Sequence, residues 1–367
     1  MKIDPHLPAV SALSRSTSAP QRSPDCVQLT HSRPLPEVDR ATALAACVSQ
    51  PGVVGDAAFQ AHFDHKQGWL GADGAYSFPL KDGRVFWLFS DTITGSIGVD
   101  GSLQPGWGML HNSWGSQETA QSPMKPVADS LFPGQDEHSW YWVYGGEGGE
   151  DHGALVLLGS FTTSTGPEGF NFRQNGAALA RLRLDGERPE VESITPVPHF
   201  CAGPPPTHWG AGLLRHQGNL YIYGTRDHGD HKELVVARTP QLDDFSAWTF
   251  WNGQQWSAQP EQAAPIGPSV ANELSVSTHG EQFEVITQVG SEIWRHRSDN
   301  PTGPFQGQRV YQIPTPDSGV LTYNAKLHPH IKDDRGMLLT YNQNVYPVDQ
   351  LLQRPDLYRP HCLRYKP

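Results

Sequence analysis

Five glycine-containing turns, each followed by a short apolar segment, constrain the fold of this chain more than any other feature. The turn glycines are Gly83, Gly153, Gly218, Gly280 and Gly336. The apolar segments that follow them span residues 85–89, 155–158, 220–223, 283–286 and 337–340. Successive turns are 70, 65, 62 and 56 residues apart, long enough for one four-stranded sheet per step and too irregular for a tight solenoid. The repeat predicts an all-β fold, a five-bladed β-propeller.

Composition supports this prediction and excludes several classes of protein. A chain of 367 residues with 37% hydrophobic residues can bury one large core, and 37 Gly and 32 Pro without a long helical period favour short strands joined by turns. A net charge of -11 gives no basic surface for a nucleic-acid backbone. The sequence has no apolar run long enough for a membrane span and no CxxC pair for a zinc ribbon. We expect a monomer without a cofactor.

Residues 1–55 differ in composition from the predicted propeller at 56–367. They are rich in Ser, Pro, Ala and Arg, as in the stretch 11–20. Such a segment buries too little apolar surface to offset its chain entropy, so we expect a disordered leader. A plain tail needs no role, whereas the leader also resembles in composition the Ser-rich leaders exported by bacterial type III secretion. Secretion without a cleaved apolar signal peptide is therefore one prediction, and a cytoplasmic protein is the alternative.

The repeat places polar residues at one mouth of the central channel. In an antiparallel hairpin, the start of the first strand and the end of the second lie at the same edge. Ahead of the turns stand Asp73, Glu147, His208, Glu273 and His328, and eight residues after the turn glycines stand Asp91, Arg226, Gln288 and Asn344. We expect these side chains to line the mouth. Blade two breaks the pattern, because Phe161 occupies the later position.

Blade one carries the most specific candidates for catalysis. A single Asp between small residues is usually part of a turn, but one hairpin returns both Asp73 and Asp91 to the same edge, with Asn112 later in the blade. Hydrolysis of a glycosidic bond needs such a pair: a protonated acid for the leaving oxygen and an ionised base or nucleophile. Neighbouring charge and burial would separate the pKa values of the two groups.

Two glutamates have less certain roles. Glu273 opens blade four, where it could be the proton donor, a modulator of the aspartate pair, or a surface residue paired with a Lys or Arg. Glu147 lies in the Gly-rich segment 145–151, which is typical of a flexible acidic loop. We therefore predict a catalytic role for Glu273 and only a substrate contact for Glu147.

Histidines and aromatic residues complete the predicted mouth. His208 and His328 could bind sugar hydroxyls, although a packed core histidine is the alternative, and together with Asp73 and Asp91 they could also converge on a metal ion. We favour the sugar contacts and predict no metal. Trp69 and Trp209 suit the apolar faces of sugars, yet blade cores are also built from Trp. The predicted substrate contacts are Trp69, Asn112, Glu147, His208, Trp209, Arg226, His328 and Asn344.

The segments 69–77, 86–92, 208–211, 272–276 and 341–344, with His328-Pro329, resemble glycoside hydrolase family 183. That family comprises five-bladed propellers and includes endo-D-arabinanases acting on mycobacterial arabinans. The resemblance spans about residues 60–367 and implies that Asp73 and Asp91 are catalytic. It matches blade two only loosely and does not include the leader.

These arguments lead to one primary prediction and one alternative. The primary prediction is a glycoside hydrolase that cleaves furanosidic linkages, with a D-arabinan-type polysaccharide as the favoured substrate, endo action and no cofactor. The alternative is a non-catalytic propeller, exported as an effector, that binds a glycan or a protein. Release of reducing ends from a glycan would distinguish the two.

Overall fold

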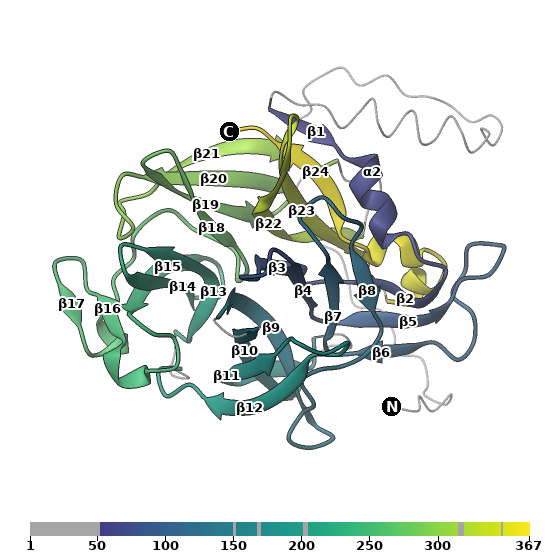
Figure 1. Ribbon diagram of the computed structural model, residues 1–367, viewed down its shortest axis with the longest axis horizontal. Helices are drawn as coiled ribbons and strands as arrows, with labels where there is room; N and C mark the ends of the chain where they lie inside the picture. The colour runs from purple at the N-terminus through teal and green to yellow at the C-terminus, as the bar shows by residue number, and fades with distance from the viewer. Residues whose placement is uncertain (1–51, 150–151, 167–169, 201–204, 315–318, 346–347) are drawn as a thin grey trace, which may run out of the picture. The chain divides into compact units, whose positions relative to one another are not determined.

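The computed structural model describes residues 52–149, 152–166, 170–200, 205–314, 319–345 and 348–367, and these form a five-bladed β-propeller. The inner strands of the blades, β3, β9, β13, β18 and β22, neighbour one another in a closed ring. In Figure 1 they lie around a common centre, and the colour runs around the ring from blade one to blade five. The predicted fold is confirmed.

Blades one, two and three follow one another in the chain, each with its inner strand first. Blade one contains β3 (Tyr76–Pro79), β4 (Val85–Phe89), β7 (Ser113–Gln117) and β8 (Lys125–Val127). Blade two contains β9 (Ser139–Gly148), β10 (Gly153–Thr163), β11 (Phe172–Arg183) and β12 (Glu190–Pro196). Blade three contains β13 (Thr207–His216), β14 (Asn219–Asp227), β15 (Lys232–Thr239), β16 (Thr249–Trp251) and β17 (Trp256–Ser257).

Blade five closes the ring, because it combines the first strand of the described residues with the last three. Blade four contains β18 (Ser275–His279), β19 (Gln282–Val289), β20 (Glu292–Ser298) and β21 (Gln306–Gln312). Blade five contains β22 (Val320–Asp333), β23 (Gly336–Val345), β24 (His361–Tyr365) and, outermost, β1 (Val53–Gly55). Because β1 pairs antiparallel with β24, hydrogen bonds tie the beginning of the propeller to its end.

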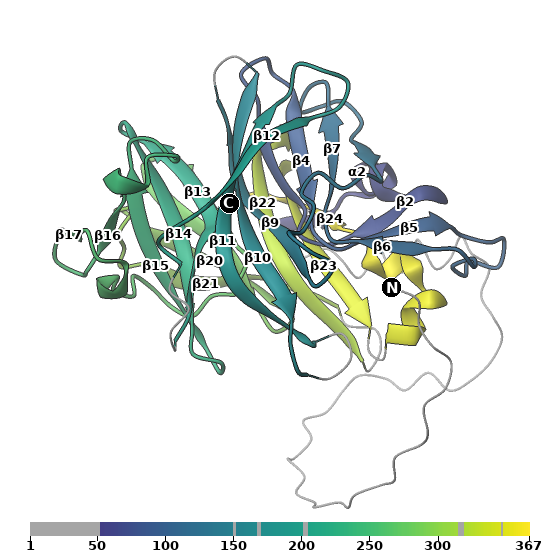
Figure 2. The same cartoon turned by 90° about the horizontal axis from the view of Figure 1, so that it is seen from below.

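A small additional sheet extends from blade one. It contains β2 (Gln67–Ala72), β5 (Thr92–Ser96) and β6 (Gly108–Leu110). The short helices are α2 (Ala57–Gln60), η1 (Ala61–Phe63), η2 (Phe245–Ala247), η3 (Pro260–Gln262), η4 (Val348–Leu352) and η5 (Pro355–Tyr358). Figure 2 shows this sheet beside blade one, with the yellow C-terminal helices next to it. η5 contacts both β2 and β23, so the additional sheet is packed against blade five as well.

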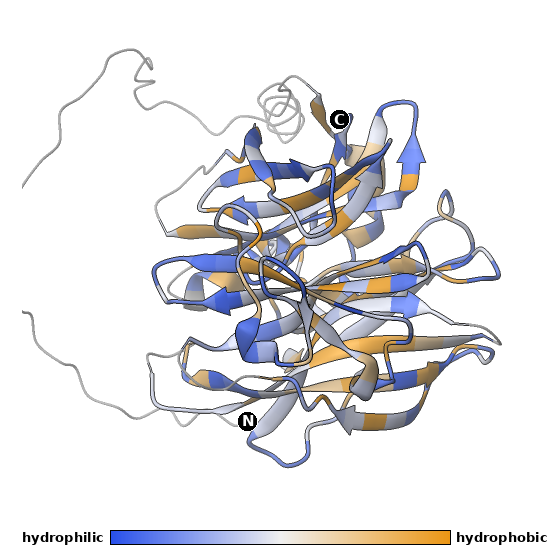
Figure 3. Cartoon of the chain, turned by 90° about the vertical axis from the view of Figure 1, so that its left-hand side faces the viewer, coloured by the Kyte–Doolittle hydropathy of each residue, from blue (hydrophilic) through white to orange (hydrophobic). Residues whose placement is uncertain are grey.

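The apolar segments of the repeat are the second strands of the blades: β4, β10, β14, β19 and β23. All five residues of β4 are buried, because a strand in the middle of a blade packs on both faces. This explains why the sequence shows apolar runs there and not strict alternation. Figure 3 shows hydrophobic segments within the sheets and hydrophilic ones at turns and edges.

Four of the five repeat glycines need the left-handed backbone conformation. Gly83, Gly218, Gly280 and Gly336 have φ values of 90°, 79°, 61° and 130°, which side-chain-bearing residues rarely adopt. At Gly336 a Cβ would also lie 2.3 Å from the Tyr365 carbonyl oxygen. Blade two differs, since His152, with φ 59°, takes the left-handed position ahead of Gly153.

The predicted leader, residues 1–55, lies almost entirely outside the described residues. Within that range, Val53–Gly55 form β1 and pair with β24, so the propeller includes three residues that the prediction from composition had assigned to the leader. Within the described ranges, no helix has the length and apolar character needed to cross a bilayer.

Candidate active site

The blade-one hairpin brings Asp73 and Asp91 together at the end of the ring where the inner strands begin. We call this the acid end, and the opposite end, with the glycine turns, the turn end. The Asp73 N–H donates to the Asp91 carbonyl oxygen at 3.1 Å, and the Ser90 N–H donates to the Asp73 carbonyl oxygen at 2.9 Å. Gly74, with φ 80°, allows this approach, because a Cβ there would lie 2.9 Å from the Ser90 nitrogen.

The Asp73 carboxyl group is held by two tyrosines from elsewhere in the chain. Tyr323 of β22 and Tyr358 of η5 donate their hydroxyls to Oδ2 at 3.0 Å and 2.9 Å. Oδ1 has no hydrogen-bond partner among the described residues. Burial raises the pKa of Asp73 well above its usual range, and the negative charges of Asp91 and Glu273 raise it further, against the two tyrosine hydrogen bonds. Asp73 is therefore the carboxyl group best suited to retain a proton.

The carboxyl group of Asp91 has different partners from that of Asp73. Its Oδ1 accepts a 2.8 Å hydrogen bond from the indole Nε1 of Trp142 and lies 3.0 Å from Nδ1 of His111. Its side chain is 20% exposed, so solvent or a ligand can reach it. The Trp142 N–H donates to this carboxyl group, whereas the Asp73 carboxyl group is buried against two tyrosine hydroxyls, so the two acids lie in unequal environments.

Glu273 reaches the same place from the loop before β18. Its Oε2 accepts a hydrogen bond from Lys326 of β22, whose side chain is only 2% exposed. Lys326 also donates to the Gly74 carbonyl oxygen at 2.5 Å and lies 4.3 Å above the Tyr76 ring. Burial lowers the pKa of Lys326, while the charges of Glu273 and Asp73 oppose that shift. Glu273 from blade four and the Asp73 carboxyl group from blade one thus lie near one buried cation from blade five.

Aromatic side chains of blade two surround Asp91. Trp142 packs against Phe161 and Phe172, with ring centroids 4.2 Å and 4.8 Å apart. Trp140 stacks on His111 at 4.6 Å, and its Nε1 is buried without a described partner. At the acid end, blade two therefore presents rings where we expected Glu147. The break in the repeat at Phe161 was the signal for this, because Phe161 pairs with Trp140 in the sheet.

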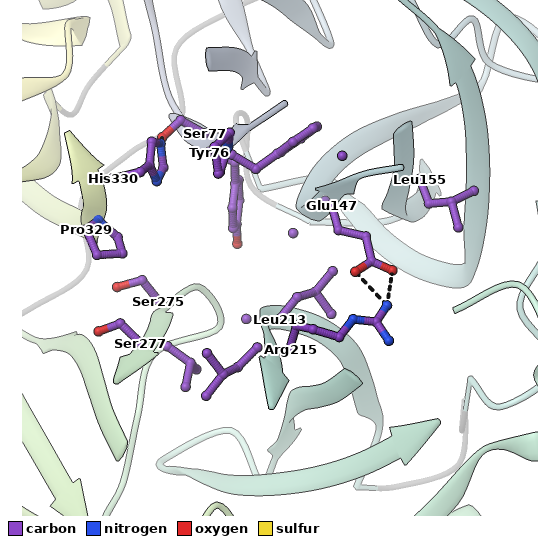
Figure 4. Close-up of a pocket in the computed structure, with 18 of the residues that line it drawn as sticks. Tyr76, Ser77, Glu147, Leu155, Leu213, Arg215, Ser275, Ser277, Pro329 and His330 are labelled. Atoms are coloured by element: carbon purple, nitrogen blue, oxygen red, sulfur yellow. Dashed lines mark hydrogen bonds and ion pairs between the residues drawn. The ribbon is translucent and has the colours of Figure 1, made fainter. Parts of the chain in front are cut away.

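The prediction for Glu147 is wrong in position. Glu147 lies near the end of β9, at the turn end, and its carboxylate accepts two 2.8 Å hydrogen bonds from Arg215. Both residues line a cavity of about 1000 Å³ (Figure 4). Tyr76 and Lys326 also line this cavity, whereas Asp73, Asp91 and Glu273 do not. Tyr76 and Lys326 therefore lie between the cavity and the three acids.

Trp69, Asn112 and Trp209 are structural, contrary to the prediction that they contact substrate. Trp69 and Trp209 are 2% and 1% exposed and pack in the hydrophobic core. Asn112 is 1% exposed; its amide donates to the Phe132 and Tyr141 carbonyl oxygens, and its Oδ1 accepts three further hydrogen bonds. Burial of an amide needs this full set of partners, so Asn112 anchors a loop.

His328 and Arg226, also predicted to contact substrate, are bound by other residues of the protein. His328 is buried between Ser77 and Thr340, with its nitrogens 2.6 Å and 2.9 Å from their hydroxyls, so it is a core histidine. Arg226 is occupied by Thr207, Glu233 and the Ala263 carbonyl oxygen. The prediction for His328 is therefore wrong, and the substrate contact of Arg226, whose side chain is 15% exposed, stays a prediction.

His208 and Asn344 remain candidates for contacts with substrate. His208, at the start of β13, has a buried Nδ1 without a described partner, and burial lowers its pKa to about 4. Asn344 lies at the acid end of β23, and its Oδ1 accepts from the Val345 N–H.

The alternative of a metal bound by His208, His328, Asp73 and Asp91 is not supported. Among the described residues, their donor atoms do not form a group close enough to share an ion. His328 is committed to two hydroxyls, and Asp73 to two tyrosines.

Sequence reasoning missed Tyr358, Lys326 and His111. Tyr358 belongs to a short helix outside the repeat, so no spacing argument could place it. Lys326 lies two residues before His328, within a strand that has register shifts on both sides. His111 is the neighbour of Asn112, which we selected in its place.

A family profile described as a domain of unknown function, DUF5005, matches residues 56–367. The chain belongs to the DUF5005 family. A search of curated proteins found no match. The family is one of unknown function, so the narrower assignment of this DUF5005 protein to glycoside hydrolase family 183 stays a prediction.

Solved structures resemble the DUF5005 propeller in fold. A Bacteroides ovatus protein presumed to be a hydrolase matches with a TM-score of 0.70 and 21% identity, over 85% of this chain and 89% of that chain. A β-xylosidase/α-arabinofuranosidase from a compost metagenome gives a TM-score of 0.48 and 12% identity, over 86% of this chain and 94% of that chain. The first likeness shows the shared fold, and the second is too distant to support an argument.

Proposed function

We propose that this protein is a glycoside hydrolase whose active site is the acid end of the propeller. The observation that carries the proposal is the convergence of Asp73, Asp91 and Glu273 in unequal environments. Glycosidases need two carboxyl groups that hold different protonation states at the same pH. A hydrolase-like relative of the same fold adds support.

We infer the roles of the acids from their environments. Asp73, with its raised pKa, is the proton donor to the leaving oxygen. Its proton resides on Oδ1, because Oδ2 already accepts two hydroxyl hydrogen bonds. Asp91, ionised and partly exposed, is the base or the nucleophile. Glu273 holds Lys326 in place, and its charge keeps Asp73 protonated.

The site's charge suits the chemistry of the transition state. Glycosidic cleavage passes through an oxocarbenium-like species, which carries positive charge on the sugar ring. Two carboxylates and one protonated acid near a single cation leave an excess of negative charge at the acid end. Fixed charge of this kind stabilises a developing cation.

We propose a furanosidic polysaccharide of the D-arabinan type as substrate and endo action on it. The resemblance to family 183 at residues 69–77 and 86–92 motivates the choice of sugar. The rings of Trp140 and Trp142, next to Asp91, supply apolar surface for a sugar face.

The test is release of reducing ends from a panel of arabinans, fructans and plant-wall glycans. On any glycan that is cleaved, Asp73→Asn and Asp91→Asn should each lower turnover by roughly 10²–10⁴-fold. Asp82→Asn is the matched control, because Asp82 lies in the same hairpin at the turn end and binds only Arg84 and His152.

Two outcomes would decide against the proposal. Near-wild-type turnover by both Asp73→Asn and Asp91→Asn would remove these residues from catalysis. Binding of a glycan at the acid end without any release of reducing ends would favour the non-catalytic binding propeller.

A further inference from the structure

We propose that His228, His231 and Glu233, in the β14–β15 hairpin of blade three, form a binding site for a divalent transition metal, with Zn²⁺ as the best-suited ion. Their ligand atoms all lie within 4.8 Å of one another. The site is separate from Asp73, Asp91 and Glu273, and it does not depend on the proposed hydrolysis.

A tight turn places the two histidines opposite each other. β14 ends at Asp227, which pairs with Lys232 at the start of β15. The His228 N–H donates to the His231 carbonyl oxygen at 3.0 Å, so only Gly229 and Asp230 form the turn itself. Gly229 has φ 89°, as such a turn requires. The two imidazole rings consequently lie parallel, with centroids 4.7 Å apart.

The start of β15 supplies the third ligand. Glu233 is the second residue of β15, directly after the turn that carries the two histidines. Its Oε2 is 3.3 Å from Nε2 of His228. Metal ligands sit about 2.0–2.2 Å from Zn²⁺, so the two imidazoles must rotate out of their parallel stack to point at one ion. Both histidines are exposed, so solvent surrounds them and no core packing opposes this rotation.

A carboxylate outside the ligand set orients one histidine. Asp230 Oδ1 lies 2.7 Å from Nδ1 of His231, which leaves Nε2 of that ring for a metal. This is the usual arrangement of zinc-bound histidines, in which a carboxylate fixes the tautomer and increases ligand basicity. Nη1 of Arg226 lies 3.4 Å from Oε2 of Glu233 and restricts the position of this carboxylate.

The donor set defines the chemistry of the ion. Two imidazoles and one carboxylate favour Zn²⁺, Cu²⁺, Ni²⁺ or Co²⁺ over Ca²⁺ and Mg²⁺, which prefer oxygen ligands. Three protein ligands leave a fourth position for water or for an oxygen of a ligand. Arg226, on the same hairpin, pairs with Thr207 at the start of β13, so the hairpin is at the acid end.

The test is calorimetric titration of the untagged full chain, stripped with a chelator, with Zn²⁺ and then Co²⁺. We expect one equivalent to bind, and His228→Ala or His231→Ala to weaken binding by more than tenfold. Asp230→Asn should weaken it by about 10-fold or more without abolishing it. His138→Ala is the matched control, because His138 is an exposed histidine near the Glu137 carboxylate that belongs to no cluster of three ligand-bearing residues in the described ranges.

Circular dichroism of each variant checks that the fold is retained. Absence of stoichiometric Zn²⁺ binding by the wild-type chain would overturn the proposal. Binding that survives unchanged in His228→Ala and His231→Ala would place the ion elsewhere and overturn it equally. Co²⁺ bound by the wild type should show visible absorption bands that the two histidine variants lack.

Discussion

The two ends of the propeller differ in how their charges are balanced. At the acid end, the charges of Asp91 and Glu273 both act on Asp73, and the buried cation Lys326 pairs with Glu273. At the turn end, the cavity of about 1000 Å³ is lined by two ion pairs, Glu147 with Arg215 and Asp243 with Arg181. In an ion pair the two charges compensate each other, whereas an excess of negative charge raises the pKa of a neighbouring carboxyl group.

The largest expected effect on stability concerns the two glutamates. Glu273→Gln leaves the buried ammonium group of Lys326 without its counter-ion, which should cost about 3–5 kcal/mol of unfolding free energy. Glu147→Gln, at the more exposed pair with Arg215, should cost less than about 1 kcal/mol. Denaturant unfolding of both variants measures the contrast. The double variant Glu273→Gln/Lys326→Met should regain part of the loss, and equal losses for the two single variants would remove the distinction between the ends.

A smaller effect should appear in the pH dependence of hydrolysis. If Asp73 donates the proton, kcat/KM falls as pH rises through its raised pKa. The Tyr358 hydroxyl stabilises the ionised form, so Tyr358→Phe should move this alkaline limb to higher pH by about 0.7, the equivalent of one hydrogen bond.

The control for the pH experiment is Tyr311→Phe, which removes a buried hydroxyl without a described partner. Its pH profile should match that of the wild type. A shift of the Tyr358→Phe limb to lower pH would mean that the Tyr358 hydroxyl stabilises the protonated form of the titrating group, contrary to the assignment of this limb to Asp73.

The smallest effect concerns the stability cost of the buried acid. Because the pKa of Asp73 is raised in the folded state, folding is favoured below its unfolded pKa and this contribution is lost as pH rises through the folded pKa. Asp73→Asn keeps a neutral side chain at every pH, so its thermal midpoint at pH 8 should exceed that of the wild type by roughly 2 °C. The gain should vanish near pH 4.

Asp82→Asn should show the opposite sign in the same scan. Arg84 lowers the pKa of Asp82 to about 2, so the carboxylate stabilises the fold at neutral pH and its loss lowers the thermal midpoint. A midpoint for Asp73→Asn well below that of the wild type at pH 8 would contradict the assignment of Asp73 as a group held protonated by its surroundings.

Local rules predicted the fold because each blade repeats them. The turn glycines, the apolar segments after them and the hairpin argument for Asp73 and Asp91 all rest on contacts between neighbours in the chain. The same counting failed for Glu147, because β9 is ten residues long and carries Glu147 to the turn end. It also failed to distinguish the buried Trp69 and Trp209 from partly exposed aromatic residues such as Trp140, because burial depends on contacts with neighbouring blades.

By itself, the sequence determined the number of blades, the position of the hairpins and the meeting of two aspartates, since turn chemistry and strand alternation act over a few residues. Only the tertiary structure decided which acid keeps its proton. That choice depends on Tyr323, Tyr358, Glu273 and Lys326, which reach Asp73 from up to 285 residues away. Electrostatic interactions depend on distance through space, and closing the ring is what sets those distances.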